Sequence, residues 1–408
     1  MNALSGDTPM FVEVDDKYGV YTLRELFELH KQGRAIKVPA LLDEYGNIGW
    51  VEVEDVVSFG KQRLKRITLA TTRLYVEISE GTIIPAYSCE LFRGKEEKRI
   101  KLKIKYVNNL KVARDPEYND TFLLAKQIPL RLPEGNQEEW EIGFALGYFI
   151  AEGSLVYRKR KNTKQSLAKL NGFAKQKGMS LDEYLEYMTD IGLVRLSIGQ
   201  LDFERGYAGI VKKHFKFATP YKRKNENAYD LVSSDLSLIH LIKDHINGSD
   251  SHTKHLKNEA YNHSWMFLKG ILDGFLAGDG SYYKKGDLFR VGITTNYNLY
   301  NDLIFLSKGL GYDVHLWKAK YESGGFANGK FYYHLYLSIF KNYHRHTALG
   351  LVKEHIKSIE DISENAAFNL ILKPLYPEND ARSAFNHLFI VAYGILVSDA
   401  VKTFTKLH

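Results

Sequence analysis

The sequence predicts a multidomain chain in which an all-β domain, made from the two ends of the chain, is interrupted by an inserted α/β (α+β) domain. Residues 11–106 are mostly strand-like, longer helical patterns alternate with strands from Gln137 onward, and short strand-like runs return after about Pro374. Insertions enter domains at exposed loops. A β-rich segment on each side of a mixed middle is therefore what an insertion would produce.

The expected elements follow from local patterns. Alternating and β-branched runs predict N-terminal strands at FVEV, WVEVEDVV, RITLATTRLYVEI and IKLKIKYV. The segment TLRELFELHKQG (22–33) predicts a short helix that ends at Gly33, and RLPEGN (131–136) reads as a linker. The middle and the tail carry further strand patterns, at residues 193–199, 288–295, 332–340 and 387–397. Residues 162–190 predict an extra helical stretch.

Composition restricts the class of protein. A chain of 408 residues suggests two or three domains, and 44% hydrophobic with 26% charged residues is typical of folded globular proteins. The longest apolar run, Leu388–Val397, is far shorter than a spanning helix needs, and the N-terminus lacks the pattern of a secretory signal. One cysteine, Cys89, excludes an intramolecular disulfide framework. These features predict an intracellular, cytoplasmic protein without a membrane partner.

Basic residues are concentrated in three segments. Residues 93–114 carry nine basic and two acidic side chains, residues 157–164 carry five basic side chains, and residues 212–224 carry six, interleaved with aromatic rings. A single basic segment is usually a solvated surface. Three of them favour a polyanionic partner such as nucleic acid.

The middle of the chain contains an internal repeat. EIGFALGYFIAEGSLVY (141–157) matches FLKGILDGFLAGDGSYY (267–283), with small residues every four positions: Gly143, Gly147 and Ala151 in one copy, and Gly270, Gly274 and Gly278 in the other. This spacing places each trio along one ridge of a helix, so two helix backbones can approach closely.

An acidic residue, Glu152 or Asp279, follows the last small position of each copy and precedes a glycine. Two carboxylates at the ends of tightly packed helices repel each other and favour a bound cation, for which Mg²⁺ (or Mn²⁺) is the natural match. Incidental acids on two core helices are the alternative reading. The repeated register makes that reading improbable.

These motifs resemble the two motifs of a double-motif LAGLIDADG homing endonuclease, over about residues 138–345. The segment 290–318 is similar to the strand–helix segment of that family, and residues 228–247 are its expected counterpart in the first repeat. The resemblance implies a monomer of two pseudo-symmetric repeats that cuts double-stranded DNA at a long recognition site, with Glu152 and Asp279 as catalytic, metal-binding acids. It also implies a nearby basic residue, for which Lys254, Lys257, Lys318 and Lys330 are candidates.

The flanks resemble an intein. SGDT at 5–8 looks like the opening block of the Hint (hedgehog/intein) splicing fold, and NHLFIVAYGILVSDA at 386–400 looks like the closing block, with His387. The resemblance implies Hint segments at 5–130 and 366–399 around an endonuclease at 131–365, whose repeats span about 138–250 and 251–345. Residues 1–4 and 400–408 are then remnants of the host (extein) protein, the partner in cis, or a tag.

The splicing residues depart from the family pattern. Ser5 is the expected nucleophile toward the Leu4 carbonyl. In this resemblance the family's Thr and His correspond to Ala86 and Cys89, and its terminal Asn corresponds to Asp399. Ala400 offers no nucleophile to receive an acyl group. Splicing is therefore expected to be impaired as the chain stands.

Three alternatives remain open from the sequence. One is an autoprocessing intein with an inactive endonuclease, which the presence of both acids disfavours. Another is a LAGLIDADG RNA-binding maturase, which the Hint-like flanks disfavour. The last is a mixed α/β nucleic-acid-binding protein without catalysis.

Overall fold

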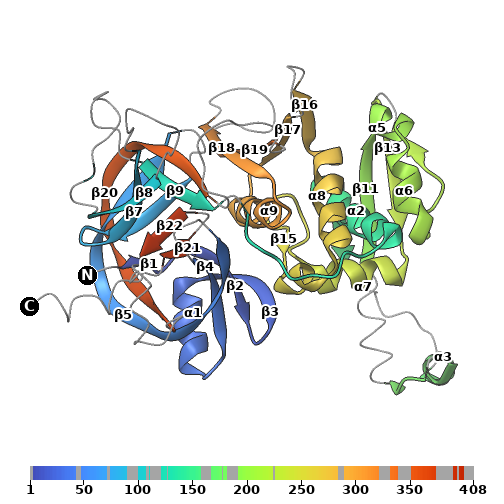
Figure 1. Ribbon diagram of the computed structural model, residues 1–408. Helices are drawn as coiled ribbons and strands as arrows, with labels where there is room; N and C mark the ends of the chain where they lie inside the picture. The colour runs from blue at the N-terminus through green and yellow to red at the C-terminus, as the bar shows by residue number, and fades with distance from the viewer. Residues whose placement is uncertain are drawn as a thin grey trace, which may run out of the picture. The chain divides into compact units, whose positions relative to one another are not determined.

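The computed structural model describes residues 3–42, 47–70, 74–89, 100–106, 110, 121–125, 127–157, 167–176, 178–181, 192–223, 226–283, 289–320, 331–338, 351–373, 389–392 and 395–398. The chain forms two compact units (Figure 1). The first contains Met1–Pro133, Tyr261–His263 and Tyr282–His408, and the second contains Glu134–Ala260 and Ser264–Ser281.

The first unit is built on a ten-stranded sheet that combines strands from both ends of the chain, in the order β1-β6-β5-β20-β9-β22-β21-β4-β2-β3. Its strands are β1 (Leu4–Ser5), β2 (Pro9–Val14), β3 (Lys17–Thr22), β4 (Ile36–Leu41), β5 (Ile48–Leu69), β6 (Tyr75–Ser79), β9 (Thr121–Ala125), β20 (Leu351–Leu372), β21 (Phe389–Ala392) and β22 (Ile395–Ser398). A separate pair joins β7 (Ile83–Cys89) to β8 (Ile100–Tyr106).

Two 22-residue strands, β5 and β20, run antiparallel and form the long curved ribbons of Figure 1. The predicted boundary between residues 365 and 366 falls inside β20. This strand pairs with β9 over Leu351–His355 and with β5 from Ile356 to Leu372, with four register shifts along the β5 pairing. The expected inserted domain, 131–365, also differs from the second unit, because residues from Tyr282 onward group with the first.

Helix α1 (Leu23–Lys31) confirms the helix predicted at 22–33. Thr22 and Glu25 form a reciprocal capping box at its start, and Gly33, with φ of +77°, lies just beyond its end. The helix buries Leu23 and Leu26. Aromatic rings fill another part of this core, where Phe11 lies 5.1 Å from Tyr261 and 6.0 Å from Phe305 between ring centroids.

The second unit is dominated by two helices, α2 (Gln137–Glu152) and α8 (Trp265–Gly278). A four-stranded sheet follows α2, in the order β10-β11-β13-β12. Its strands are β10 (Gly153–Tyr157), β11 (Gly192–Gly199), β12 (Tyr221–Lys222) and β13 (Ala228–Ser233). Its other described elements are α3 (Leu167–Gln176), α5 (Gln200–Glu204), α6 (Tyr207–His214), α7 (Leu236–His245), β14 (Ile246–Asn247) and β15 (His255–Leu256). The short helix η2 (Asn258–Asn262) begins in this unit, and its last two residues group with the first.

The strand order after α8 repeats that after α2. The strands β16 (Gly280–Tyr283), β17 (Phe289–Thr294), β18 (Asp313–Lys320) and β19 (Phe331–Ser338) lie in the order β16-β17-β19-β18, with α9 (Tyr297–Gly309) between β17 and β18 in the sequence. By this order β17 corresponds to β11, and β19 corresponds to β13. The expected match of 290–318 with 228–247 is therefore wrong, because β13 occupies a different place in its sheet.

Candidate functional site

The small residues of the repeat lie where α2 and α8 meet. A Cβ atom added to Gly143 or Gly147 would lie less than 3.0 Å from the backbone carbonyl of Phe267 or Ile271. Gly270 and Gly274 face the carbonyls of Trp140 and Phe144 in the same way. The predicted ridge contact is confirmed, since the two backbones touch where any side chain would collide. All of these residues belong to the second unit.

Capping side chains fix where these helices begin. Asn136 caps α2 and forms a capping box with Glu139, and Ser264 caps α8 through the Phe267 N–H at 3.2 Å. At the other end, Glu152 is the last residue of α2 and Asp279 is the C-cap of α8. A Cβ atom at Gly278 would lie 2.9 Å from Cγ of Glu152, so the two acid-bearing ends are adjacent.

The two carboxylates interact electrostatically. Burial raises the pKa of Glu152, and the charge of Asp202 raises it further. Asp279 is exposed as a whole residue. Desolvation of its carboxyl group by the surrounding protein, together with the charge of Glu152, nevertheless raises its pKa to about 7. Because the charge of Glu152 makes Asp279 harder to ionise, a cation placed between the two carboxylates would be attracted strongly.

Lys254, one of the four candidate lysines, lies within electrostatic reach of both acids. Its positive charge lowers the pKa of Glu152 and of Asp279. Its Nζ donates to the carbonyls of Phe149 (2.8 Å) and Gly153 (2.5 Å), and the residue is only 1% exposed. Burial lowers the pKa of Lys254 to about 8. Lys254 therefore also stabilises the carbonyl end of α2, where positive charge is favourable.

The other candidates do not join this site in the described structure. Lys257 donates to the carbonyl of Lys243. The side chain of Lys318 and the whole of Lys330 lie outside the described residues.

Two polar groups near the acids were not predicted from the sequence. Asp202 in α5 contributes a further negative charge near Glu152. Tyr148, one helical turn before Glu152, is fully buried and its hydroxyl has no hydrogen-bond partner among the described residues. Asp202 comes near Glu152 only through the tertiary fold, so no local sequence pattern indicates it. Tyr148 lies within the repeat motif, where the sequence pattern predicts only a buried aromatic residue.

The donors at this site suit a hard divalent cation. Mg²⁺ characteristically takes one or two protein carboxylates and completes its shell with water and substrate phosphate. Glu152 and Asp279 supply two such oxygen donors with access to solvent. No group of three or more His, Cys, Asp or Glu side chains that could hold a metal occurs among the described residues.

The raised pKa of Asp279 predicts a pH-dependent stability. Its pKa is about 7 in the folded chain and 3.8 as the reference value, so the folded state binds more protons between these limits and stability falls as pH rises from about 4 to about 7. Asp279→Asn removes this loss. In metal-free buffer at pH 8 we expect the variant to be more stable by about 1–2 kcal/mol, a value reduced for the solvent exposure of the carboxyl.

Thermal unfolding of parent and Asp279→Asn, each measured from pH 4 to pH 8 in a chelator, checks this expectation. Adding Mg²⁺ at pH 8 should stabilise the parent and leave the variant unchanged. Identical pH profiles of stability for the two proteins would show that the surroundings of Asp279 do not raise its pKa.

Ser5 is fully buried in the first unit, at the point where β1 pairs with both β6 and β20. Its Oγ accepts hydrogen bonds from Asn365 Nδ2 at 3.0 Å and from the Asp7 N–H at 3.4 Å. Ala3 and Leu4, expected as part of a host remnant, are each only 2% exposed. The bond between Leu4 and Ser5 is therefore held inside the sheet.

The side chains that hold the segment before Ser5 differ from those expected. The Ala3 N–H donates to Ser79 Oγ (3.1 Å) and Thr82 Oγ1 (3.2 Å), and the Ser79 N–H donates to the Ala3 carbonyl (2.8 Å). The expected positions Ala86 and Cys89 lie in β7, which pairs with β8 and not with β1. The strand that pairs with Leu4 opposite β20 is β6, and the assignment of Ala86 and Cys89 stays a prediction. Their side chains, and His387, Asp399 and Ala400, lie outside the described residues.

Two basic side chains of the third basic segment form ion pairs within the protein. Lys213 Nζ lies 2.6 Å from Glu141, and Arg223 Nη2 lies 2.6 Å from Asp230. Phe215 is buried, whereas Tyr221 is 60% exposed. Most of residues 93–114 and 157–164 lie outside the described residues, so their side chains are not placed.

No protein-family model and no curated protein matches the chain. Among solved structures it is similar to mesophilic variants of the homing endonuclease I-DmoI, with 13% identity over 50% of this chain and 91% of that one, at a TM-score of 0.31. It is also similar to the Pab PolII intein (21% identity, 33% and 71% covered, TM-score 0.23) and to the N-terminal LAGLIDADG domain of WhiA (9% identity, 50% and 78% covered, TM-score 0.28).

The two families that the motifs resemble are thus both found among the similar structures. Other structures of I-DmoI hold DNA with Ca and DNA with Mn. Of the described helices, none is both long and apolar enough to cross a membrane.

Proposed function

We propose that this chain is an intein that carries a LAGLIDADG homing endonuclease, and that its second unit presents Glu152 and Asp279 for metal-dependent cleavage of double-stranded DNA. The observation that supports this most directly is the contact of α2 and α8 through their glycine ridges. That contact brings the two repeat acids to adjacent helix ends, in reach of one another's charge and of solvent.

In this proposal Glu152 and Asp279 hold Mg²⁺ or Mn²⁺, which when bound would polarise the scissile phosphates and lower the pKa of water. The protein's own contribution is to hold two like charges together. The glycine contacts fix the helix ends, and the ammonium group of Lys254 limits the repulsion between the acids. The DNA, with a long recognition site, would be held by basic side chains at its phosphates.

A plasmid library with randomised inserts tests the nuclease proposal. The purified chain should linearise a subset of inserts with a shared sequence in Mg²⁺ or Mn²⁺, and none in a chelator. Cleavage that is equal in the chelator, or no linear product from any insert, would contradict it.

For the β unit we propose a protein-splicing role in which Ser5 attacks the Leu4 carbonyl and ligation is blocked at Ala400. The burial of the Leu4–Ser5 bond between β6 and β20 supports a bond held for intramolecular reaction. At the far end the proposal relies on the sequence, where Asp399 replaces the cyclising Asn and Ala400 lacks a hydroxyl.

The chain as it stands should therefore remain an intact precursor when it is flanked by two reporter proteins. Hydroxylamine should release at most a slow product cut after Leu4, because an ester at Ser5 can form but cannot be passed on. Changing Asp399→Asn together with Ala400→Ser should raise the yield of ligated reporters, measured by intact mass. Efficient ligation without these changes would show that the junction is assigned wrongly.

A further inference from the structure

A chain of hydrogen bonds leads from the surface of the first unit to the buried Ser5. Arg24 Nη2 donates to Asp7 Oδ1 at 3.2 Å, and Asp7 Oδ2 accepts from Asn365 Nδ2 at 2.8 Å. The same Nδ2 donates to Ser5 Oγ at 3.0 Å. One amide group therefore connects a charged pair to the oxygen that the proposed splicing reaction uses.

The orientation of the Asn365 amide is determined by its other contact. Its Oδ1 accepts the Ala366 N–H at 2.8 Å, so its NH₂ group must face Ser5 and Asp7. A β-bulge aims this side chain: β20 advances from Ile362 to Asn365 while β5 advances only from Leu64 to Gln62. Extra residues of this kind commonly redirect a side chain beside an active site.

We propose that Asn365 is a positioning residue for the Ser5 hydroxyl, and that Asp7 and Arg24 hold its amide in place. This inference rests on the proposed role of Ser5. In the acyl shift, the bond from Ser5 Oγ to the Leu4 carbonyl carbon forms and the bond from that carbon to the Ser5 nitrogen breaks. The hydroxyl proton ends on the released amine, and Asn365 remains neutral throughout.

The physical effect of Asn365 follows from its chemistry. An amide NH₂ can only donate, so Ser5 Oγ is held as an acceptor by Asn365 and by the Asp7 N–H. Donors aimed at an oxygen stabilise negative charge on it and lower the pKa of its hydroxyl. They also fix its rotamer, which matters because a near-attack geometry contributes strongly to intramolecular reactions.

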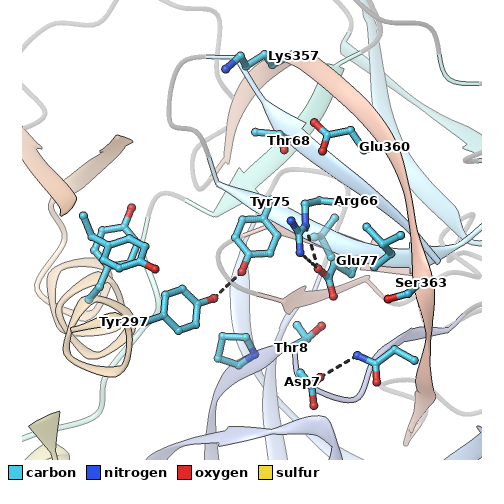
Figure 2. Close-up of a pocket in the computed structure, with 16 residues that line it drawn as sticks. Asp7, Thr8, Arg66, Thr68, Tyr75, Glu77, Tyr297, Lys357, Glu360 and Ser363 are labelled. Atoms are coloured by element: carbon cyan, nitrogen blue, oxygen red, sulfur yellow. Dashed lines mark hydrogen bonds and ion pairs between the residues drawn. The ribbon is translucent and has the colours of Figure 1, made fainter. Parts of the chain in front are cut away.

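Solvent reaches this network through a cavity of about 720 Å³. Asp7 and Asn365 line it together with Arg66, Tyr75 and Glu77 (Figure 2). Ser5 is fully buried and is not among the lining residues. Figure 2 shows Asp7 accepting its hydrogen bond at one edge of the cavity, away from the Tyr75–Tyr297 pair. A titratable group introduced at position 365 would therefore exchange protons with bulk water.

The pKa of a thiol at position 5 gives a direct test that does not require splicing. In a Ser5→Cys, Cys89→Ser background, the ¹³Cβ shift of the thiol is followed against pH, with and without Asn365→Ala. Loss of the donor should raise the thiol pKa by about one unit. Ser363→Ala, an exposed change in the same bulge, is the matched control and should leave it unchanged. An unaltered thiol pKa in Asn365→Ala would overturn the proposal.

The second readout is cleavage after Leu4 by hydroxylamine in the Ser5 background. Asn365→Ala should slow it by about tenfold, as expected for a lost positioning group. The near-isosteric Asn365→Asp can donate to Ser5 only when protonated, and the adjacent Asp7 favours the proton being retained. Its rate, relative to the parent at each pH, should therefore rise as pH falls below about 6.

The outcomes separate the two proposals. A constant Asn365→Asp to parent ratio across pH would show that Asn365 has only a structural role. If hydroxylamine releases nothing from any variant, Ser5 is not the nucleophile and the proposed splicing function fails. The thiol pKa then still decides whether Asn365 acts on the side chain at position 5.

Discussion

Replacing Glu152 with Gln or Asp279 with Asn is expected to lower the rate of DNA cleavage by at least ~10²-fold, the scale of losing a positioned catalytic group. Each amide keeps the size of the acid and removes its charge, so the metal loses a ligand while the helix packing survives. DNA binding should persist and should weaken with salt in variants and parent alike, because affinity arises mainly from basic side chains at phosphates.

Glu138→Gln is the matched control for this pair. Glu138 is an exposed acid in the first turn of α2, about 20 Å along the helix from Glu152. Its variant should cut at the parental rate. Cleavage and binding are measured on one target fragment found in the library screen. If Glu152→Gln or Asp279→Asn still cuts both strands at the parental rate, the catalytic assignment is wrong, and a nick from a single variant would show two independent sites.

The second large effect is expected from the helix contact itself. Gly147→Ala and Gly274→Ala each place a Cβ atom less than 3.0 Å from a carbonyl of the opposite helix, and a backbone cannot rotate away as a side chain can. We expect each to destabilise the chain by about 3 kcal/mol or more, at the upper end of overpacking costs. Both variants should also lose cleavage, because the two acids separate with the helices.

Gly209→Ala provides the control for helix propensity. Gly209 is an exposed position in α6, where an added Cβ would have no neighbour within 4 Å. Alanine there should raise stability by up to about 1 kcal/mol, since glycine disfavours the helix interior. Urea unfolding followed by circular dichroism compares the three variants. Parental stability in Gly147→Ala would mean that α2 and α8 do not pack backbone to backbone.

These two tests are complementary because they change different parts of the proposed site, namely its two carboxylates and the helix contact that holds them together. The carboxylate variants should lose cleavage and keep stability, and Asp279→Asn should even gain stability at pH 8. The glycine variants should lose both. A chain whose activity loss always followed its stability would have a structural helix pair and no metal site.

Much of the local structure could be predicted because its signals lie within short segments. Thr22, Glu25 and Gly33 mark α1 through capping and turn chemistry, and the small-residue period marks the faces of α2 and α8. The strand patterns at 193–199, 288–295 and 332–340 correspond to β11, β17 and β19. Hydrophobic period and capping are local properties, so no knowledge of the neighbours was needed.

The sequence by itself determined the repeat, the two acids that end it, and the serine that opens the β unit. Only the tertiary structure decided what surrounds them. Asp202 approaches Glu152 from another helix, and Asn365 reaches Ser5 from 360 positions away through a bulge in β20. The same holds for the pairing of β6 with Leu4, which no local pattern indicates. Such partners are set by strand register and helix packing between distant segments, which leave no local pattern in the residues themselves.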